Sequence, residues 1–202
     1  RCSRDWSSDV CSSDLVVVRS LRRGDADTWQ EVRTRNHAWL APWDATVPPG
    51  GPARPSSYRV VVRSLLHQAR QGLSLPFVVE VDGRFVGQVT VSNVARGSAQ
   101  WASIGYWVAA DVAGRGIAPR AVAMVVDHCL GPVGLHRVEI CIRPENSNSL
   151  RVVEKLGLRE VGFAPHFLHI DGAWRDHRIF AVTREEAPAG VEVRLSTHQS
   201  HQ

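Results

Sequence analysis

The chain has 202 residues, of which 44% are hydrophobic and 22% are charged. These proportions are typical of one globular domain and exclude a disordered or fibrous protein. The net charge of +4 suits an anionic ligand but is too small to predict direct nucleic-acid binding. No apolar run is long enough to cross a bilayer, so we expect no membrane insertion.

The first fifteen residues differ from the rest of the chain. Residues 1–15 are polar and serine-rich without helical or strand periodicity, and from residue 5 onward they read like a translated sequencing adapter. We therefore expect a non-native extension, which carries Cys2 and Cys11. The remaining Cys129 and Cys141 form no CxxC pattern, which predicts reduced thiols in a cytoplasmic protein. The histidines lack ligand spacing, so no metal site is expected.

Periodicity and turn residues predict a mixed α+β domain over residues 16–185. The first half is expected to contain a strand at Val16–Val18, a helix capped by Asp25 or Asp27 and ending near Ala41, a loop at Val47–Pro55, and a helix from Ser56 or Ser57 to Gln71. An antiparallel meander should follow over Pro76–Val81, Phe85–Val94 and Gln100–Val108.

The second half is expected to contain a helix at Pro119–Leu130, a strand at His136–Ile142, a helix capped by Ser147 or Asn148 and ending at Leu156, and a hairpin of Val161–Ile170 and Trp174–Thr183. This order implies one parallel pair of strands, at the glycine-rich loop between the meander and the next helix. Residues 186–202 show no pattern and are expected to form a loose tail.

The glycine-rich loop lies at a strand-to-helix junction. Gly114 and Gly116 flank Arg115 directly before an apolar helical run. Such a junction exposes backbone N–H groups at the positive end of a helix, which suits a phosphate or pyrophosphate. A glycine turn that only starts a helix fits this stretch equally well.

A second motif makes the first more informative. Arg143 to Phe163 reads R-P-E-N-S-N-S-L-R-V-V-E-K-L-G-L-R-E-V-G-F, and H-I-D-G-A-W-R-D-H follows it. Together with G-R-G-I-A upstream, these motifs resemble the GNAT superfamily of N-acetyltransferases, and more narrowly its RimJ/RimL branch, which acetylates the N-terminal amine of ribosomal proteins. The resemblance covers roughly Val16 to Glu185. It implies a mixed, mostly antiparallel twisted sheet flanked by helices, with a strand–glycine loop–helix site for acetyl-CoA.

The resemblance also implies which residues bind acetyl-CoA. The pyrophosphate site would consist of Gly114, Arg115, Gly116, Ile117 and Ala118. The preceding strand, at Tyr106, Trp107 and Val108, would pair its backbone with the pantetheine arm, and Asn146 would lie near that arm. Three residues before the first glycine, where the family has glutamine or arginine, stands Asp111. Its carboxylate would lie close to the pyrophosphate and departs from the family pattern, and Arg115 could offset its charge.

Acetyl transfer needs a neutral amine, a stabilised oxyanion and a hydrogen-bond donor for the leaving thiolate. The resemblance makes Ser149 the candidate donor, although helix capping would equally explain Ser149 and Asn146. Strand alternation places Glu139 on one face with Cys141 and Arg143. Glu139 is therefore a candidate base, and a salt bridge with a neighbouring arginine is its structural alternative. We disfavour Cys141 as an acyl carrier, since no histidine is paired with it in the sequence.

Further residues are candidates for the acceptor site or for the base. His166 and His169 are weaker candidates for the base. Trp39 and Trp43 match a segment that shapes the acceptor cleft, or they pack between helices. The W-R-D-H stretch, Trp174, Arg175, Asp176 and His177, contacts the acceptor or holds its hairpin.

The expected function is transfer of an acetyl group from acetyl-CoA to a primary amine, by direct attack in a ternary complex. The leading acceptor is the N-terminus of a ribosomal protein. The alternatives are a small-molecule amine, such as an antibiotic or polyamine, and a non-catalytic acyl-CoA-binding module. The protein is expected to be a monomer or a homodimer.

Overall fold

The computed structural model describes residues 11–13, 16–52, 55 and 57–195. The strands are β1 (Cys11–Ser13), β2 (Val16–Ser20), β3 (Leu75–Val81), β4 (Arg84–Ala95), β5 (Trp101–Val108), β6 (Arg137–Ile142), β7 (Arg159–Ile170) and β8 (Ala173–Thr183). The α-helices are α1 (Ala26–Arg35), α2 (His37–Leu40), α3 (Tyr58–Arg70), α4 (Ile117–Leu130) and α5 (Ser147–Lys155). Short 3₁₀ helices are η1 (Arg23–Asp25), η2 (Ala41–Trp43) and η3 (Ala110–Val112).

Within the described residues, the strands form one eight-stranded sheet in the order β1-β2-β3-β4-β5-β6-β8-β7. Every neighbouring pair is antiparallel except β5 and β6, which run parallel. The predicted α+β class and the single parallel junction are confirmed. None of the helices in the described ranges is both long and apolar enough to span a membrane.

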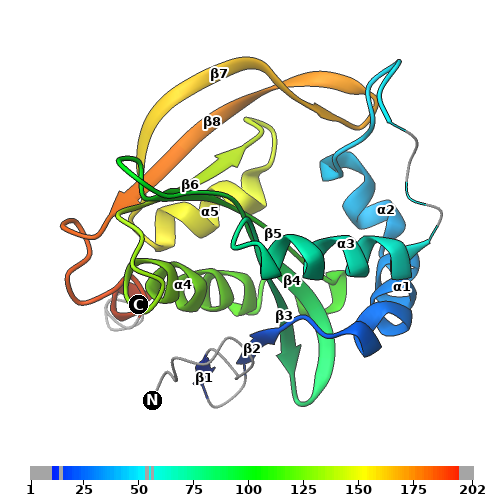
Figure 1. Ribbon diagram of the computed structural model, residues 1–202, viewed down its shortest axis with the longest axis horizontal. Helices are drawn as coiled ribbons and strands as arrows, with labels where there is room; N and C mark the ends of the chain where they lie inside the picture. Colours follow the sequence, from blue (N-terminus) through cyan, green and yellow to red (C-terminus); the bar gives the residue numbers. More distant parts are fainter. Residues whose placement is uncertain (1–10, 14–15, 53–54, 56, 196–202) are drawn as a thin grey trace.

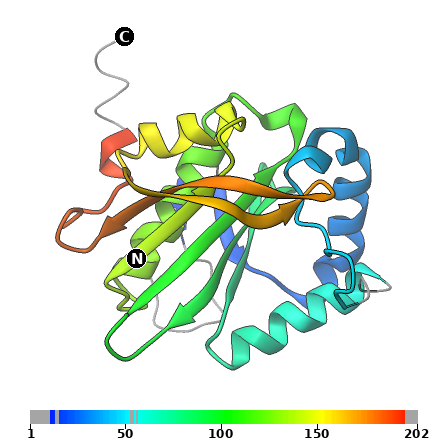
Figure 2. The same ribbon diagram turned by 90° about the horizontal axis from the view of Figure 1, so that it is seen from above.

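Helices cover both sides of the sheet (Figure 1). Helices α4 and α5 lie together on one side, and α3 lies on the other (Figure 2). Helix α4 packs on β2, β4, β5 and β6, and every residue from Ala121 to Val126 is buried. Burial of this apolar helix fixes its N-terminal end, and therefore the glycine loop, against the sheet.

Several boundaries differ from the sequence-based expectation. Strand β2 continues to Ser20 because it pairs with β3 along its whole length. Helix α4 begins at Ile117, two residues earlier than expected, since Pro119 is compatible with the first helical turn. Asn146, rather than Ser147 or Asn148, caps α5. Residues 11–13 form a strand that the sequence pattern did not predict, and the rest of 1–15 lies outside the described residues.

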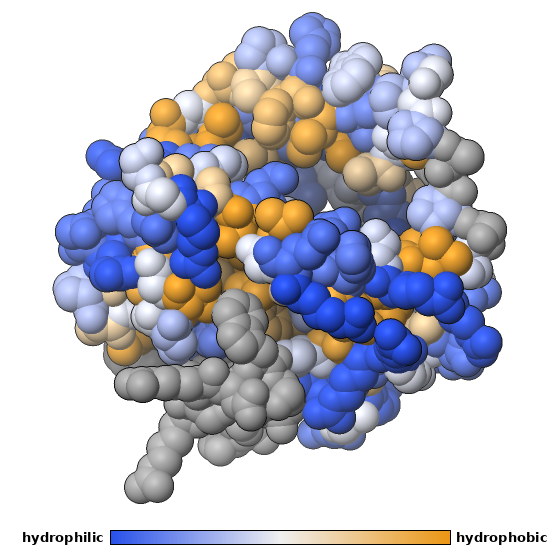
Figure 3. Space-filling view, in the orientation of Figure 1, coloured by the Kyte–Doolittle hydropathy of each residue, from blue (hydrophilic) through white to orange (hydrophobic). Residues whose placement is uncertain are grey.

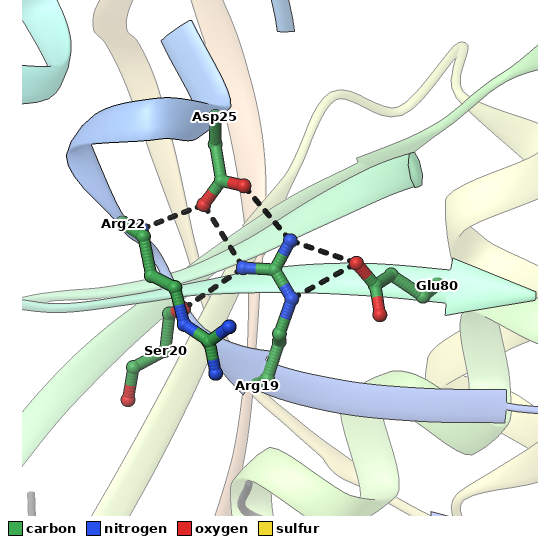
Figure 4. A network of polar contacts seen from close by, with 5 residues as sticks. All are labelled: Arg19, Ser20, Arg22, Asp25 and Glu80. Atoms are coloured by element: carbon green, nitrogen blue, oxygen red, sulfur yellow. Dashed lines mark hydrogen bonds and ion pairs between the residues drawn. The ribbon is translucent and has the colours of Figure 1, made fainter. Parts of the chain in front are cut away.

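An arginine joins the first strand to the first helix (Figure 4). Arg19 of β2 donates through Nη1 and Nη2 to the carboxylate of Asp25, at 2.9 and 2.8 Å, and through Nε to Glu80 of β3 at 2.9 Å. Asp25 does occupy the N-cap position of α1, but its side chain makes no capping hydrogen bond to that helix. Its carboxylate is bound instead to Arg19 and to the backbone N–H of Arg22.

The C-terminal segment 186–195 is packed against the protein, contrary to the expected loose tail. Val191 is fully buried. Asp127 of α4 accepts hydrogen bonds from the backbone N–H groups of Val191 and Glu192, at 2.6 and 3.1 Å. Arg194 donates to the carbonyl of Leu156 at the end of α5, at 2.8 Å. The segment therefore holds α4 and α5 together. Residues 196–202 lie outside the described residues.

Candidate active site

Strands β5 and β6 pair only at their beginnings and then separate. The parallel register joins Trp101–Ser103 to Arg137–Glu139, whereas β5 continues to Val108 and β6 to Ile142. A cavity of about 640 Å³ opens between them, a volume typical of small-molecule sites. Among the described residues, no strand pairs with this edge of β5 beyond Ser103, so its backbone is available to an extended ligand.

The glycine loop closes one end of the cavity. Gly114 and Gly116 have φ angles of +78° and +79°, in the left-handed region that penalises any residue with a Cβ. Gly116 is the N-cap of the 14-residue α4, so the N–H groups of Ile117 and Ala118 have no partner within the helix. All four residues line the cavity. The positive end of α4 therefore faces the space where an anion would lie.

Helix α5 forms the opposite wall. Asn146 Oδ1 accepts the backbone N–H of Ser149 at 3.1 Å, which confirms the capping interpretation of Asn146. Both residues also line the cavity. The phenol of Tyr106 on β5 donates to the backbone carbonyl of Ser149 at 3.3 Å, and burial raises the pKa of this phenol, so it stays protonated. The expected thiolate donor and the expected pantetheine strand are thus in contact.

Two tryptophans connect the N-terminal helices to the cavity, which both of them line. Trp39 Nε1 donates to the carbonyl of Val108 at 3.1 Å. The Arg143 guanidinium lies 5.3 Å from the ring centre of Trp43, and its Nη1 donates to the carbonyl of Pro42 at 2.6 Å. Trp39 and Trp43 therefore shape the cavity wall while also packing between elements.

The β7–β8 hairpin reaches the segment after α2 (Figure 1), and Leu168, Ile170 and His177 of this hairpin line the cavity. Ala45 forms an antiparallel bridge with Ile170. The backbone N–H of Thr46 donates to the carbonyl of His169 at 2.8 Å, and that of Asp171 donates to Asp44 at 3.1 Å. This contact, which we call the strap, contributes Asp44, Ala45 and Ile170 to the lining of the cavity.

Comparison with known proteins identifies the family. The chain matches the family model described as an acetyltransferase (GNAT) domain over residues 16–159. The chain belongs to the GNAT acetyltransferase family. Among solved structures, RimJ from Mycobacterium smegmatis in complex with CoA-disulfide is 40% identical, with a TM-score of 0.82, and the match covers 91% of this chain and 89% of that one.

Two curated relatives extend the comparison. The ribosomal protein uS5-alanine N-acetyltransferase of Escherichia coli is 27% identical over 89% of this chain and 93% of that protein. The probable N-acetyltransferase YjcK of Bacillus subtilis is 39% identical, but the match spans only 50% of this chain and 56% of that protein. Membership of the GNAT family makes acetyl-CoA the acyl donor.

Most of the cofactor and substrate residues expected from the sequence lie together in this GNAT site. The cavity is lined by the expected residues Trp39, Trp43, Tyr106, Trp107, Val108, Gly114, Gly116, Ile117, Ala118, Asn146 and Ser149. Three expected residues, Arg115, Glu139 and Trp174, do not line it, and neither do His166 and His169, the weaker candidates for the base. Arg115 is exposed beside the loop. Trp174 is 52% exposed and packs edge-on against the ring of His169.

Glu139 is not among the residues that line the cavity. Glu139 lies opposite Ser103, where β5 and β6 are still paired, and the cavity begins only one residue later, at Ile140. Its carboxylate accepts a hydrogen bond from Nε of Arg137 at 2.7 Å. The salt bridge considered as its structural alternative is therefore what the structure contains. Asp111 also lies outside the cavity, where its carboxylate is 3.6 Å from Arg84, so it does not oppose the anion as expected.

The structure adds site residues that the sequence reasoning missed. Arg151 and Lys155 line the cavity from successive turns of α5. Their i, i+4 spacing was visible in the sequence and places both cations on one helix face. Cys141, which the sequence analysis had considered, also lines the cavity. The pKa of its thiol is raised to about 11, mainly by burial and to a smaller extent by the negative charge of Glu139. A neutral thiol is a weak nucleophile, which argues against an acyl-cysteine. The buried His177 lines the cavity too, and it belongs to the W-R-D-H stretch that the sequence analysis associated with the acceptor or the hairpin.

Proposed function

We propose that this protein transfers the acetyl group of acetyl-CoA to the N-terminal amine of a ribosomal protein in the cytoplasm, by direct attack within a ternary complex. The observation that carries this proposal is the cavity between the diverging β5 and β6, with a helix N-terminus at one end and the strap in its lining. We assign the activity to residues 16–185 and treat residues 1–15 as a non-native extension.

The part of the cavity between the glycine loop, α5 and the edge of β5, which we call the donor half, fits the parts of acetyl-CoA. The N–H groups of Ile117 and Ala118 suit the pyrophosphate, and Arg151 and Lys155 add positive charge for phosphate groups. The unpaired edge of β5 suits the amide groups of the pantetheine arm. Ser149 lies beside Tyr106, where its hydroxyl would donate a hydrogen bond to sulfur as negative charge develops there.

The acceptor half favours a flexible chain end. The strap joins residues 44–46 to the hairpin tip and lines part of the cavity. Apolar side chains are exposed along the same hairpin (Figure 3), including Phe163, Phe167 and Leu168. An extended N-terminus can enter the cavity and rest on this surface. The likeness to the uS5-alanine N-acetyltransferase of E. coli supports the same acceptor class.

The test is release of the CoA thiol by the full chain. Acetyl-CoA is mixed with ribosomal-protein N-terminal peptides, with the same peptides blocked at the N-terminus, with spermidine and with an aminoglycoside. We expect release only with free N-terminal peptides. Ser149→Ala should lower kcat and leave acetyl-CoA affinity intact, whereas Ser147→Ala, at an exposed position of the same helix, should leave both unchanged.

Other outcomes would favour the alternatives. Release with small amines alone would indicate an enzyme acting on antibiotics or polyamines. Acetyl-CoA binding without release for any amine would indicate a non-catalytic binding module.

A further inference from the structure

Glu139 does not line the cavity, so a base in direct contact with the amine must be one of the residues that do. The titratable residues lining the cavity in the described part of the chain are Asp44, Tyr106, Cys141, Arg143, Arg151, Lys155 and His177. Asp44 is bound in a salt bridge to Arg33. Tyr106 and Cys141 are protonated at neutral pH because burial raises their pKa values, and the arginines and the lysine carry positive charge.

His177 is the remaining group, and its environment leaves one ring nitrogen ready to accept a proton. Its residue exposure is 3%. Nδ1 lies 3.0 Å from the backbone carbonyl of Arg175, which can only accept a hydrogen bond, so Nδ1 carries the hydrogen. Nε2 then bears the lone pair. The Phe167 ring packs edge-on against the imidazole, with ring centres 5.8 Å apart, and helps to hold its orientation.

The position of His177 matches the acceptor side of the cavity. The β6–β8 register ends with Ile142 opposite Arg178, so His177 lies one residue further along, beside the end of β6. Arg143 follows directly in the chain and contacts Trp43 on the cavity wall. His177 therefore lines the cavity from β8, next to the end of β6 and close to the charge of Arg143.

We propose that His177 is the general base that accepts a proton from the acceptor amine. This inference rests on the proposed function. An N-terminal amine, with an ordinary pKa of about 7.7–8.0, arrives largely as the ammonium ion. One N–H proton passes to Nε2 of His177, and the freed lone pair forms the C–N bond to the acetyl carbon. The C–S bond then breaks, its electron pair remains on sulfur, and the second amine proton neutralises the thiolate. His177 afterwards releases its proton to solvent.

The electrostatic surroundings keep the imidazole neutral before the reaction. Burial is the largest cause of a lowered His177 pKa, and the positive charge of Arg143 acts in the same direction. The Arg175 carbonyl, Asp176 and Glu145 oppose this shift without reversing it. A neutral imidazole at physiological pH can accept a proton from an ammonium ion, which an already charged one could not.

The test compares His177→Gln and His177→Ala with His166→Gln, a control on the same hairpin whose side chain does not line the cavity. We expect His177→Gln to lower kcat by about 10²–10⁴-fold while acetyl-CoA affinity, measured by calorimetry, stays unchanged. In this variant the fall in kcat at acid pH should follow the pKa of the bound amine and no longer that of His177. Imidazole added to His177→Ala should restore part of the rate, and His166→Gln should behave like the wild type.

Two results would overturn the inference. The first is a His177→Gln variant with the wild-type kcat and pH profile. The second is a His177→Ala variant that binds acetyl-CoA normally, is slow, and gains nothing from imidazole. Both require an active wild type. A wild type that releases no thiol with any amine would instead refute the proposed function.

Discussion

The glycine loop makes a quantitative prediction for Gly116→Ala. Gly116 adopts φ +79° and ψ 2° at the N-cap of α4, and a Cβ built there meets nothing within 4 Å. The cost of alanine is therefore conformational rather than steric, about 1–2 kcal/mol for a left-handed residue. For a domain of this size, the expected fall in Tm is about 2–8 °C. Acetyl-CoA should also bind less tightly, because the methyl group prevents close approach of the backbone to the anion.

Chemical denaturation with and without acetyl-CoA measures both effects, since a ligand that binds only the folded state raises the free energy of unfolding. Gly116→Asn should recover most of the lost stability, because asparagine tolerates the left-handed conformation. Gly24→Ala is the matched control, since Gly24 also has open space around its Cβ but no positive φ. That variant should be neutral or slightly stabilised.

The explanation of the loop would be refuted if Gly116→Ala unfolded at the wild-type midpoint and bound acetyl-CoA as tightly as the wild type. The left-handed geometry would then be neither required for the fold nor used by the ligand.

Three further predictions concern stability and donor binding. Arg19→Ala should lower the free energy of unfolding by about 2–4 kcal/mol in urea denaturation, since it breaks charged hydrogen bonds to Asp25 and Glu80. Arg19→Lys should retain only part of this stability, because lysine lacks the planar guanidinium group. Burial lowers the pKa of His128, so the unfolded chain takes up a proton that the folded chain excludes as pH falls below about 6.5. The stability contributed by His128 is therefore lost towards acid pH, and His128→Gln should show a flatter decline of Tm between about pH 7 and 5. Arg151→Ala should raise the Kd for acetyl-CoA and weaken its salt dependence in calorimetry, and an unchanged Kd would remove Arg151 from the donor site.

Local sequence signals were sufficient for the elements that their own residues determine. The alternation on both sides of Asp82-Gly83 predicts the hairpin, and the observed register pairs Val81 with Arg84 across it. The two loop glycines predict a backbone that only glycine adopts easily, and both have positive φ. The family resemblance in the R-P-E-N motif assigned Asn146 and Ser149 to the acetyl-CoA site. In the structure both residues line the cavity.

Features set by contacts between distant parts of the chain could not be predicted in this way. Alternation assigns Glu139 to a face of its strand, but whether that strand is still paired depends on its register with β5. The W-R-D-H stretch drew attention to His177, but its place in the cavity wall depends on β8 lying between β6 and β7, an order that no local pattern of β8 encodes. Segment 186–195 looks featureless because its partner, Asp127, lies 64 and 65 residues away from the two N–H groups it binds.

The central claim is acetylation of an N-terminal amine in the cavity between β5 and β6. The most direct measurement uses an alanine-first ribosomal-protein peptide with an internal lysine, incubated with acetyl-CoA and the full chain, followed by fragmentation mass spectrometry to locate the acetyl group. The account predicts acetylation of the α-amino group and none of the lysine. Acetyl groups on the lysine alone, or an unmodified peptide in the presence of bound acetyl-CoA, would contradict it.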